Sequence, residues 1–183
     1  MDINVNLILE NHKVSLIPLL ETDFDGLYSV ASNPEIWEQH PNKDRWKMEH
    51  FKVFFDGAMQ SKGAFKIVEK VGEKIIGSTR FYYHNKEDNS ILIGYTFYAK
   101  AYWGKGFNIS AKTLMLNYIF QFVSKVYFHI GADNIRSNIA IVRLGTTKIG
   151  EQQITYFGEQ PKLNSIYSLT KEEWNSASAK HGI

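Results

Sequence analysis

The 183-residue sequence contains no cysteine and only four prolines. The absence of cysteine excludes disulfide bonds, cysteine-ligated zinc, iron–sulfur clusters and thiol nucleophiles, and it fits a reducing compartment. A large excess of one charge is also missing, since the net charge is +2, which is too small to indicate a nucleic-acid-binding protein. No apolar stretch approaches the roughly 18 residues that a membrane span needs. We therefore expect neither nucleic acid nor a membrane as a partner.

Linkers, repeats and low-complexity tracts are missing as well. The length predicts one domain, which we place at residues 1–183. The N-terminal residues MDINVNLILENHK include an early acid, no basic region and no small-residue cleavage site, so they are not typical of a signal peptide. A cytoplasmic protein is the expectation that follows.

The first third of the sequence predicts a strand and two helices. Val14–Leu19 is a short apolar run interrupted by a proline, which is typical of an edge strand. Thr22, followed three residues later by Asp25, is typical of a helix start with the hydroxyl as N-cap. Apolar residues within Met48–Met59 recur on one helical face, and Gly63 is the expected end of that helix.

The middle of the sequence predicts a sheet followed by a buried helix. Three segments with β character are separated by short polar turns, and an antiparallel meander is their simplest arrangement. Phe107–Val123 then carries apolar residues at helical spacing on more than one side, so we expect this helix to pack deeply. The three expected strands are Ala64–Val71, Lys74–Tyr83 and Ser90–Tyr98.

The last third predicts a strand at Lys125–Gly131, then a helix that Asn134 can cap. Ile135, Ile139 and Val142 lie on one face of that helix. The remaining expected elements are the strands Ile149–Phe157 and Leu163–Leu169 and a helical turn, Thr170–Trp174.

The most informative feature is a strand, a glycine-rich turn and a helix in succession. The turn reads Trp103-Gly104-Lys105-Gly106-Phe107-Asn108. Glycines let the backbone fold tightly with its amides pointing at one spot, and the helix start adds unpaired N–H groups and a positive dipole end. These features predict a phosphate or pyrophosphate site, to which Lys105 could add a charge. A glycine-rich corner without a ligand is the alternative. The turn is too short for a P-loop and lacks the third glycine of a dinucleotide fingerprint.

A second polar cluster lies at Asn134–Asn138, between a strand and a helix. Helix capping is the simple interpretation, because Asn and Ser are preferred caps. However, several hydrogen-bonding groups follow a strand here, and ligands of α/β sheets favour the crevice at strand ends. Both interpretations stay open.

Together these two segments resemble the Gcn5-related N-acetyltransferase (GNAT) superfamily, and specifically its RimJ/RimL-like branch of ribosomal-protein alanine acetyltransferases. The superfamily signature [Arg/Gln]-x-x-Gly-x-[Gly/Ala] is matched in position by Trp103, Gly106 and Asn108. Tryptophan is common at the first place in this branch, whereas Asn108 replaces a small residue and Ser110 replaces a frequent acid. The other matching segments are Ile93–Tyr98, Asn134-x-x-Ser137-Asn138, Arg143-Leu144-Gly145 and Tyr167–Trp174. The likeness covers nearly the whole chain.

The resemblance implies an α/β (α+β) fold with a mixed, mostly antiparallel sheet of about seven strands flanked by helices. It implies that the central strands four and five splay apart, and that acetyl-CoA lies in the gap as co-substrate, without a metal. The pyrophosphate would lie on the amides of the glycine-rich turn, and the pantetheine arm would lie beside strand four. The implied cofactor-binding residues are Thr96, Phe97, Tyr98, Trp103, Gly104, Lys105, Gly106, Phe107, Asn108, Asn134 and Asn138.

The implied reaction is direct attack of a primary amine on the acetyl thioester. A lysine amine is only about 0.1% neutral near pH 7.4, whereas an α-amino group is roughly a quarter neutral. The arithmetic favours a protein N-terminus, or a small amine of similar pKa, as the acceptor. Such an amine needs little help to lose its proton, so a water chain could serve as the base. A lysine acceptor would need a stronger base. A backbone N–H of strand four could hold the oxyanion.

The resemblance also implies roles for individual side chains. Ser137 would donate a proton to the leaving thiolate, and Asn134 would position Ser137 and the sulfur; a plain helix cap is the alternative for Ser137. Trp37, His40 and Arg45 lie between the first two helices, where enzymes of this kind often bind the acceptor.

Other ionisable residues have simple interpretations. His129 is expected to be an ordinary strand residue, either packed or exposed, and Lys112 and Lys125 are expected to be solvated. The six histidines show no metal-binding spacing. A non-catalytic acyl-CoA-binding or sensing module on the same fold is the alternative function, and the apolar terminal strands would permit a homodimer.

Overall fold

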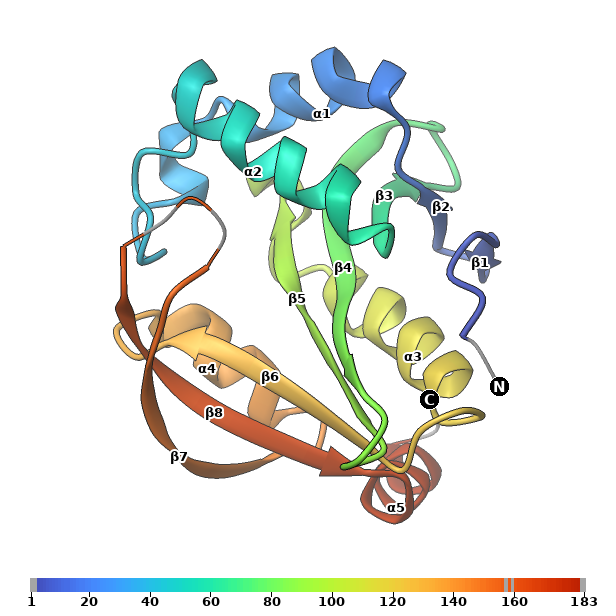
Figure 1. The fold of residues 1–183 in the computed structure, drawn as a ribbon. Coiled ribbons are helices and arrows are strands. Elements are labelled where there is room, and N and C mark those ends of the chain that lie inside the picture. The colour runs from blue at the N-terminus through green and yellow to red at the C-terminus, as the bar shows by residue number, and fades with distance from the viewer. Residues whose placement is uncertain (1–2, 157, 159, 182–183) are drawn as a thin grey trace.

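The computed structural model describes residues 3–156, 158 and 160–181. These residues form eight strands and five α-helices (Figure 1). The strands are β1 (Leu9–Glu10), β2 (Val14–Pro18), β3 (Ala64–Glu69), β4 (Ile75–Asn85), β5 (Ser90–Tyr98), β6 (Lys125–Gly131), β7 (Thr147–Ile154) and β8 (Lys162–Thr170). The helices are α1 (Phe24–Ala31), α2 (Met48–Ser61), α3 (Phe107–Ile119), α4 (Ile135–Val142) and α5 (Lys171–His181).

All eight strands belong to one mixed sheet in the order β1-β2-β3-β4-β5-β6-β8-β7. The expected meander of β3, β4 and β5 is confirmed, since both pairings are antiparallel. Only β5 and β6 are parallel, and α3 makes the crossover between them. The sheet has one strand more than expected, because the two residues of β1 pair with β2 at the edge.

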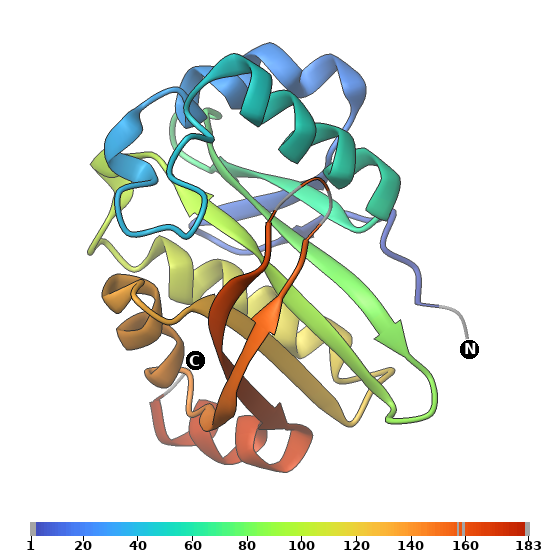
Figure 2. The same cartoon turned by 60° about the vertical axis from the view of Figure 1, so that its left-hand side comes forward.

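Helices cover both faces of the sheet (Figures 1 and 2). On one face, α1 and α2 bury Leu27, Phe51 and Phe55 in a cluster that includes Phe97 of β5. On the other face, α3, α4 and α5 contribute to a second cluster, which contains Met115. Each fully buried side chain of this kind contributes roughly 1.5–3 kcal/mol, so β5 is held firmly from both sides.

The sheet opens between its two parallel strands, β5 and β6. β5 and β6 pair only at Ser90–Lys125, Ile91–Val126 and Leu92–Tyr127, and beyond these pairs the strands diverge (Figure 1). β6 meanwhile stays paired with β8 along its whole length. The splay that the resemblance implied is thus present between the strands here named β5 and β6.

A bulge in β5 lies in the open part of this sheet. Ser78 of β4 pairs with Phe97, and Arg80 pairs with Gly94, so Tyr95 and Thr96 together oppose a single residue. Tyr95 has φ +52°, and such bulges bend a strand and are frequent beside active sites.

Several details differ from the sequence-based expectations. Thr22 does not cap α1, whose N-cap residue is Asp23 without a side-chain capping bond; the Asp23 carboxylate instead accepts a hydrogen bond from the Leu20 amide, at the start of the preceding 3-10 turn, at 2.9 Å. α2 ends at Lys62, which adopts a left-handed conformation one residue before the expected Gly63. Lys112 is buried, not solvated, because its face of α3 packs on the sheet.

The C-terminal half shows two further differences. Ile135, Ile139 and Val142 do share a face of α4, but that face is exposed and lines a cleft. The final helix is α5, longer than the single turn expected, and Thr170 begins it with a reciprocal cap to Glu173. Phe157, the expected last residue of the first terminal strand, lies outside the described residues.

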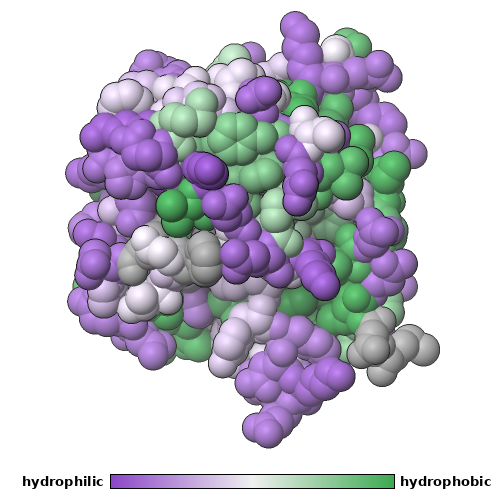
Figure 3. Space-filling view, turned by 45° about the horizontal axis from the view of Figure 1, so that its top comes forward, coloured by the Kyte–Doolittle hydropathy of each residue, from purple (hydrophilic) through white to green (hydrophobic). Residues whose placement is uncertain are grey.

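The face of the molecule drawn in Figure 3 carries both hydrophilic and hydrophobic residues. Within the described residues, no helix has the length and apolar character needed to cross a membrane.

Candidate functional site

A large cleft occupies the opening between β5 and β6, with a volume of about 1190 Å³. Its walls come from the segment 36–45, the diverging edges of β5 and β6, the glycine-rich turn with the start of α3, and α4. Segments that are far apart in the sequence, between residues 36 and 164, therefore meet at one place.

The glycine-rich turn presents unpaired backbone amides to this cleft. Gly104 and Gly106 have φ values of +70° and +78°, which glycine adopts without strain. Gly106 is the N-cap of α3 and offers no capping side chain. The amide of Ser110 is the first to reach an acceptor within the helix, the Gly106 carbonyl at 3.1 Å, so the preceding N–H groups of the first turn point outward. A Cβ added at Gly104 would meet nothing within 4 Å, which leaves room for an anion.

A lysine far away in the sequence adds positive charge at this turn. Lys13 Nζ lies 2.6 Å from the Lys105 carbonyl oxygen and 4.9 Å from the centre of the Phe107 ring. Neither lysine lines the cleft itself; Lys13 is half-buried, whereas Lys105, which we expected to add a charge, is exposed. Sequence reasoning missed Lys13 because nothing local links it to the turn.

Arg136 connects α4 to the glycine-rich turn. Its guanidinium carbon lies 3.8 Å from the centre of the Trp103 ring, and its Nη2 donates to the Ile36 carbonyl at 3.1 Å. Trp103 Nε1 in turn donates to the Tyr98 carbonyl at 2.9 Å. This stack ties three walls of the cleft together.

The open edge of β5 offers backbone groups to the cleft. Ala99 donates its amide to Ile76 of β4 at 2.7 Å. Since backbone groups of successive strand residues point to opposite edges, those of Tyr98 point toward the gap, where its carbonyl meets Trp103. Two buried polar atoms of cleft-lining residues, the Tyr98 hydroxyl and His129 Nδ1, have no hydrogen-bond partner within the described residues.

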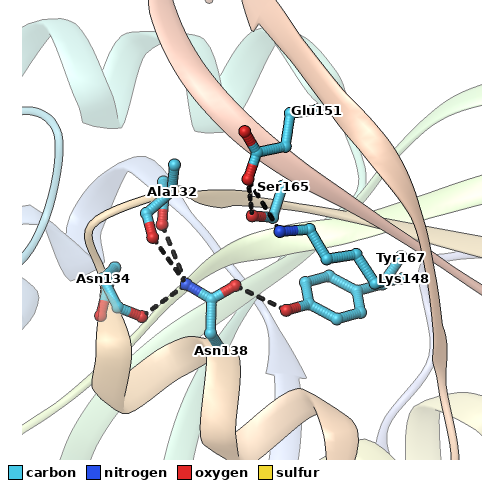
Figure 4. A network of polar contacts seen from close by, with 8 residues as sticks. Ala132, Asn134, Asn138, Lys148, Glu151, Ser165 and Tyr167 are labelled. Atoms are coloured by element: carbon cyan, nitrogen blue, oxygen red, sulfur yellow. Dashed lines mark hydrogen bonds and ion pairs between the residues drawn. The ribbon is translucent and has the colours of Figure 1, made fainter.

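The turn from β6 into α4 holds the second polar cluster. Asn134 Oδ1 accepts from the Ser137 amide at 3.2 Å, as an N-cap does. Asn138 Nδ2 donates to the carbonyls of Gly131, Ala132 and Asn134, and Tyr167 of β8 donates to its Oδ1 at 2.8 Å (Figure 4). The Asn138 side chain therefore braces this corner, while Ser137 and Asn134 line the cleft.

The three candidates for acceptor contact also come together. Arg45 is buried, with its guanidinium carbon 5.6 Å from the Trp37 ring and 4.9 Å from the Phe54 ring. His40 Nε2 lies 3.2 Å from Arg45 Nη1, and burial together with that positive charge holds the pKa of His40 well below 6.5. All three line the cleft, although the Trp37 indole N–H is bonded to the Ala31 carbonyl at 2.7 Å.

Two further ionisable residues reach the cleft although the sequence suggested ordinary roles for them. Burial lowers the pKa of Lys112 to about 7 and the pKa of His129 to about 4. No group of three or more potential metal ligands is found in the described part of the chain.

Comparison with protein families finds one domain model that matches, the acetyltransferase (GNAT) domain, over residues 13–147. No curated protein matches the chain. Many solved structures do match. A GCN5-related N-acetyltransferase from Brucella melitensis superposes with a TM-score of 0.82 at 19% identity, over 97% of this chain and 84% of that one.

Two other similar solved structures are of acetyltransferases with different descriptions. RimJ from Mycobacterium smegmatis, in complex with CoA-disulfide, has a TM-score of 0.67 at 15% identity over 92% of this chain and 89% of its own. FdhC, a nucleotide-linked sugar GNAT, has a TM-score of 0.69 at 14% identity over 97% of each chain. At these identities the likeness shows the fold alone.

Proposed function

The chain belongs to the GNAT acetyltransferase family, and we propose that it transfers an acetyl group from acetyl-CoA to a primary amine. GNAT enzymes use acetyl-CoA and act on amine acceptors. The observation that carries the proposal is the cleft between β5 and β6, with the amide-rich start of α3 at its mouth.

The residues present fit the coenzyme. We propose that the amides of residues 104–108, with Lys13 beside them, hold the pyrophosphate, because open space and left-handed glycines leave these donors accessible. The Trp103 amide, which we expected to take part, donates instead to the Lys100 carbonyl at 3.1 Å. The edge of β5 at Thr96, Phe97 and Tyr98 would hold the pantetheine arm. Asn134 lies across the cleft from this edge, and Asn138 would act by bracing the corner that Asn134 belongs to. The exposed apolar face of α4 suits the uncharged parts of the arm.

Bound acetyl-CoA supplies a thioester, and the chain's own groups would assist its aminolysis. A backbone N–H at the open edge of β5, such as that of Tyr98, would stabilise the oxyanion; losing one such donor typically costs about 3 kcal/mol of barrier. The Ser137 hydroxyl would hydrogen-bond to the leaving sulfur, and the Asn134 side chain, bonded to the Ser137 amide, would hold it in place.

For the acceptor we propose a protein N-terminal α-amine or a small amine of similar pKa. None of the described residues lining the cleft is Asp or Glu, so a carboxylate base is missing there, and an amine that is partly neutral at physiological pH needs least help. Trp37, His40 and Arg45 would contact the acceptor. We also propose a RimJ/RimL-like role, on the motifs at Trp103–Asn108 and Asn134–Asn138 that resemble that branch. A cytoplasmic location, favoured by the lack of cysteine, and homodimer formation remain part of the proposal.

The competing function is a sensing module that binds acyl-CoA without turning it over, and the lack of a carboxylate base favours it. The test is thiol release from acetyl-CoA with a panel of amines, including peptides with free N-termini. Release with at least one amine supports the enzyme. If acetyl-CoA binds but none of the amines causes release of coenzyme A, the sensor is supported. Acetyl-CoA at about 100 times a typical Kd should stabilise the fold by about 2.7 kcal/mol. If the melting temperature does not change at that concentration, both functions are refuted.

A further inference from the structure

Lys112 occupies a position in α3 where an apolar side chain would pack. It is 4% exposed, and its helix neighbours Ala111 and Met115 belong to the core. Its Nζ donates to Thr79 Oγ1 at 3.0 Å and to Thr96 Oγ1 at 2.7 Å, and those two oxygens lie 2.8 Å apart.

Among the described residues, no carboxylate is paired with this amine. Within the described residues the two threonine hydroxyls are the only hydrogen-bond partners of Nζ, and Asp and Glu are absent from the cleft lining. Burying an ammonium in such a place disfavours the charged form, and burial accordingly lowers the pKa of Lys112 to about 7. Leucine or methionine would pack at this position without that cost. A buried ionisable group that weakens the fold here therefore indicates a functional role.

The location of Lys112 suits a role in the reaction. Thr96 belongs to the bulge of β5, four residues past Leu92, the last residue of β5 that pairs with β6. Both Thr96 and Lys112 line the cleft. α3 itself starts at the glycine-rich turn, and Lys112 lies five residues from Phe107, about 7.5 Å along the helix axis at about 1.5 Å per residue. The helix that offers amides to an anion thus also carries a buried amine to the open edge of β5.

We propose that Lys112 is a catalytic residue that donates a proton to the coenzyme A thiolate as it leaves, an inference that rests on the acetyl transfer proposed above. The acceptor nitrogen bonds to the acetyl carbon, the carbon–sulfur bond breaks, and the sulfur keeps the electron pair. The Lys112 ammonium gives its proton to that sulfur, which leaves a neutral amine and a thiol. The proton lost by the acceptor nitrogen goes to water, and Lys112 takes a proton from water before the next cycle.

Ser137 and Lys112 then have different tasks. A serine hydroxyl is a much weaker acid than a thiol, so Ser137 can hydrogen-bond to the sulfur, but full transfer of its proton to a thiolate is unfavourable. A thiol has a pKa of about 8.5, so an ammonium of lower pKa gives up its proton to a thiolate favourably. The structure assigns the hydrogen bond to Ser137 and the proton to Lys112.

The test is Lys112→Met, with Lys112→Leu made in parallel so that the result does not depend on the folding of one variant. Lys125→Met is the matched control, because Lys125 pairs with Asp88 at 3.0 Å and does not line the cleft. We would measure kcat and KM with acetyl-CoA and with the acetyl thioester of 4-nitrothiophenol, whose thiolate leaves without a proton. Binding of coenzyme A alone would be measured by calorimetry.

We expect kcat with acetyl-CoA to fall about 100-fold or more in the Lys112 variants, as for loss of a general acid. Most of this loss should disappear with the nitrophenyl thioester, and affinity for coenzyme A should be unchanged. A merely structural role would lower the rates with both thioesters alike.

The pH profile provides a second readout. The ratio of the wild-type kcat to the variant kcat should decline above pH 7 as Lys112 loses its proton, because the acceptor amine becomes neutral with rising pH equally in both enzymes. The groups that face Lys112 from β4 and β5 are hydroxyls. Burial lowers the pKa of His40 and His129 and raises that of Tyr82 and Tyr98, so these groups keep one protonation state between pH 7 and 9.

Equal losses with both thioesters, or an unchanged kcat with acetyl-CoA, would overturn the role of Lys112 and leave acetyl transfer standing, because the wild type would still release coenzyme A. If the wild type releases no coenzyme A with any amine, acetyl transfer itself is refuted and this inference falls with it.

Discussion

Replacing Lys112 with methionine should stabilise the fold, and the gain should shrink as the pH rises. The pKa of this amine falls from an ordinary 10.5 to about 7 on burial, a difference of about 3.5 that corresponds to about 5 kcal/mol at about 1.36 kcal/mol per unit. Well below pH 7, both the folded and the unfolded chain carry the charge, and the full penalty acts on the fold. Relaxation and water penetration reduce such penalties, so about 5 kcal/mol is the upper bound.

The pH dependence follows from the protons bound in each state. Between pH 7 and 10.5 the unfolded chain binds more protons at Lys112 than the folded chain does, so the free energy of unfolding of the wild type rises with pH in this window. The stabilisation gained by the methionine substitution should therefore decrease with pH, from at most about 5 kcal/mol at pH 6.5 to at most about 2 kcal/mol at pH 9.

Chemical denaturation at pH 6.5, 8 and 9 measures this difference directly. Lys125→Met serves again as the control, since an ion pair on a half-exposed surface contributes about 0–1 kcal/mol, and its effect should not follow the same curve. A constant difference between wild type and the Lys112 variant across these pH values, or a less stable variant at pH 6.5, would refute the reasoning.

Three further predictions concern the glycine-rich turn, α4 and α5. Gly106→Glu should abolish coenzyme A binding in calorimetry, because it adds bulk and negative charge where the pyrophosphate is proposed; retained micromolar affinity would contradict the site. Ser137→Ala should lower kcat in the thiol-release assay without changing coenzyme A affinity, and an unaltered kcat would remove Ser137 from the reaction. Thr170→Ala should lower the free energy of unfolding by about 1 kcal/mol, since the Thr170 hydroxyl accepts from the Glu173 amide at 3.2 Å; an unchanged denaturation midpoint would show that this cap does not stabilise α5.

Local patterns were sufficient for most of the fold. The expected strand at Lys125–Gly131 has the observed bounds of β6, and α3 starts at Phe107 as expected, because alternation and helical spacing reflect which side chains must be buried. Element ends were less predictable. α2 ends on Lys62 in a left-handed conformation, a position at which glycine is the usual signal.

The candidate site likewise has features that the local sequence predicts and one that it does not. The glycine-rich turn and the Asn134–Asn138 cluster were readable because each is a short run of residues whose backbone or capping chemistry is local. The splay of β5 and β6 came from the resemblance to a family, since no local pattern tells where two strands stop pairing.

The sequence by itself predicted the order of the helices and of all strands but β1, together with an anion site at the start of α3, because spacing, glycines and caps act over a few residues. Only the tertiary structure decided that Lys13 lies beside that turn, that Arg136 stacks on Trp103, and that Lys112 is buried against two threonines. A lysine in a helix is solvated or buried according to what packs against it, and its partners here come from strands that precede it by 16 and 33 positions.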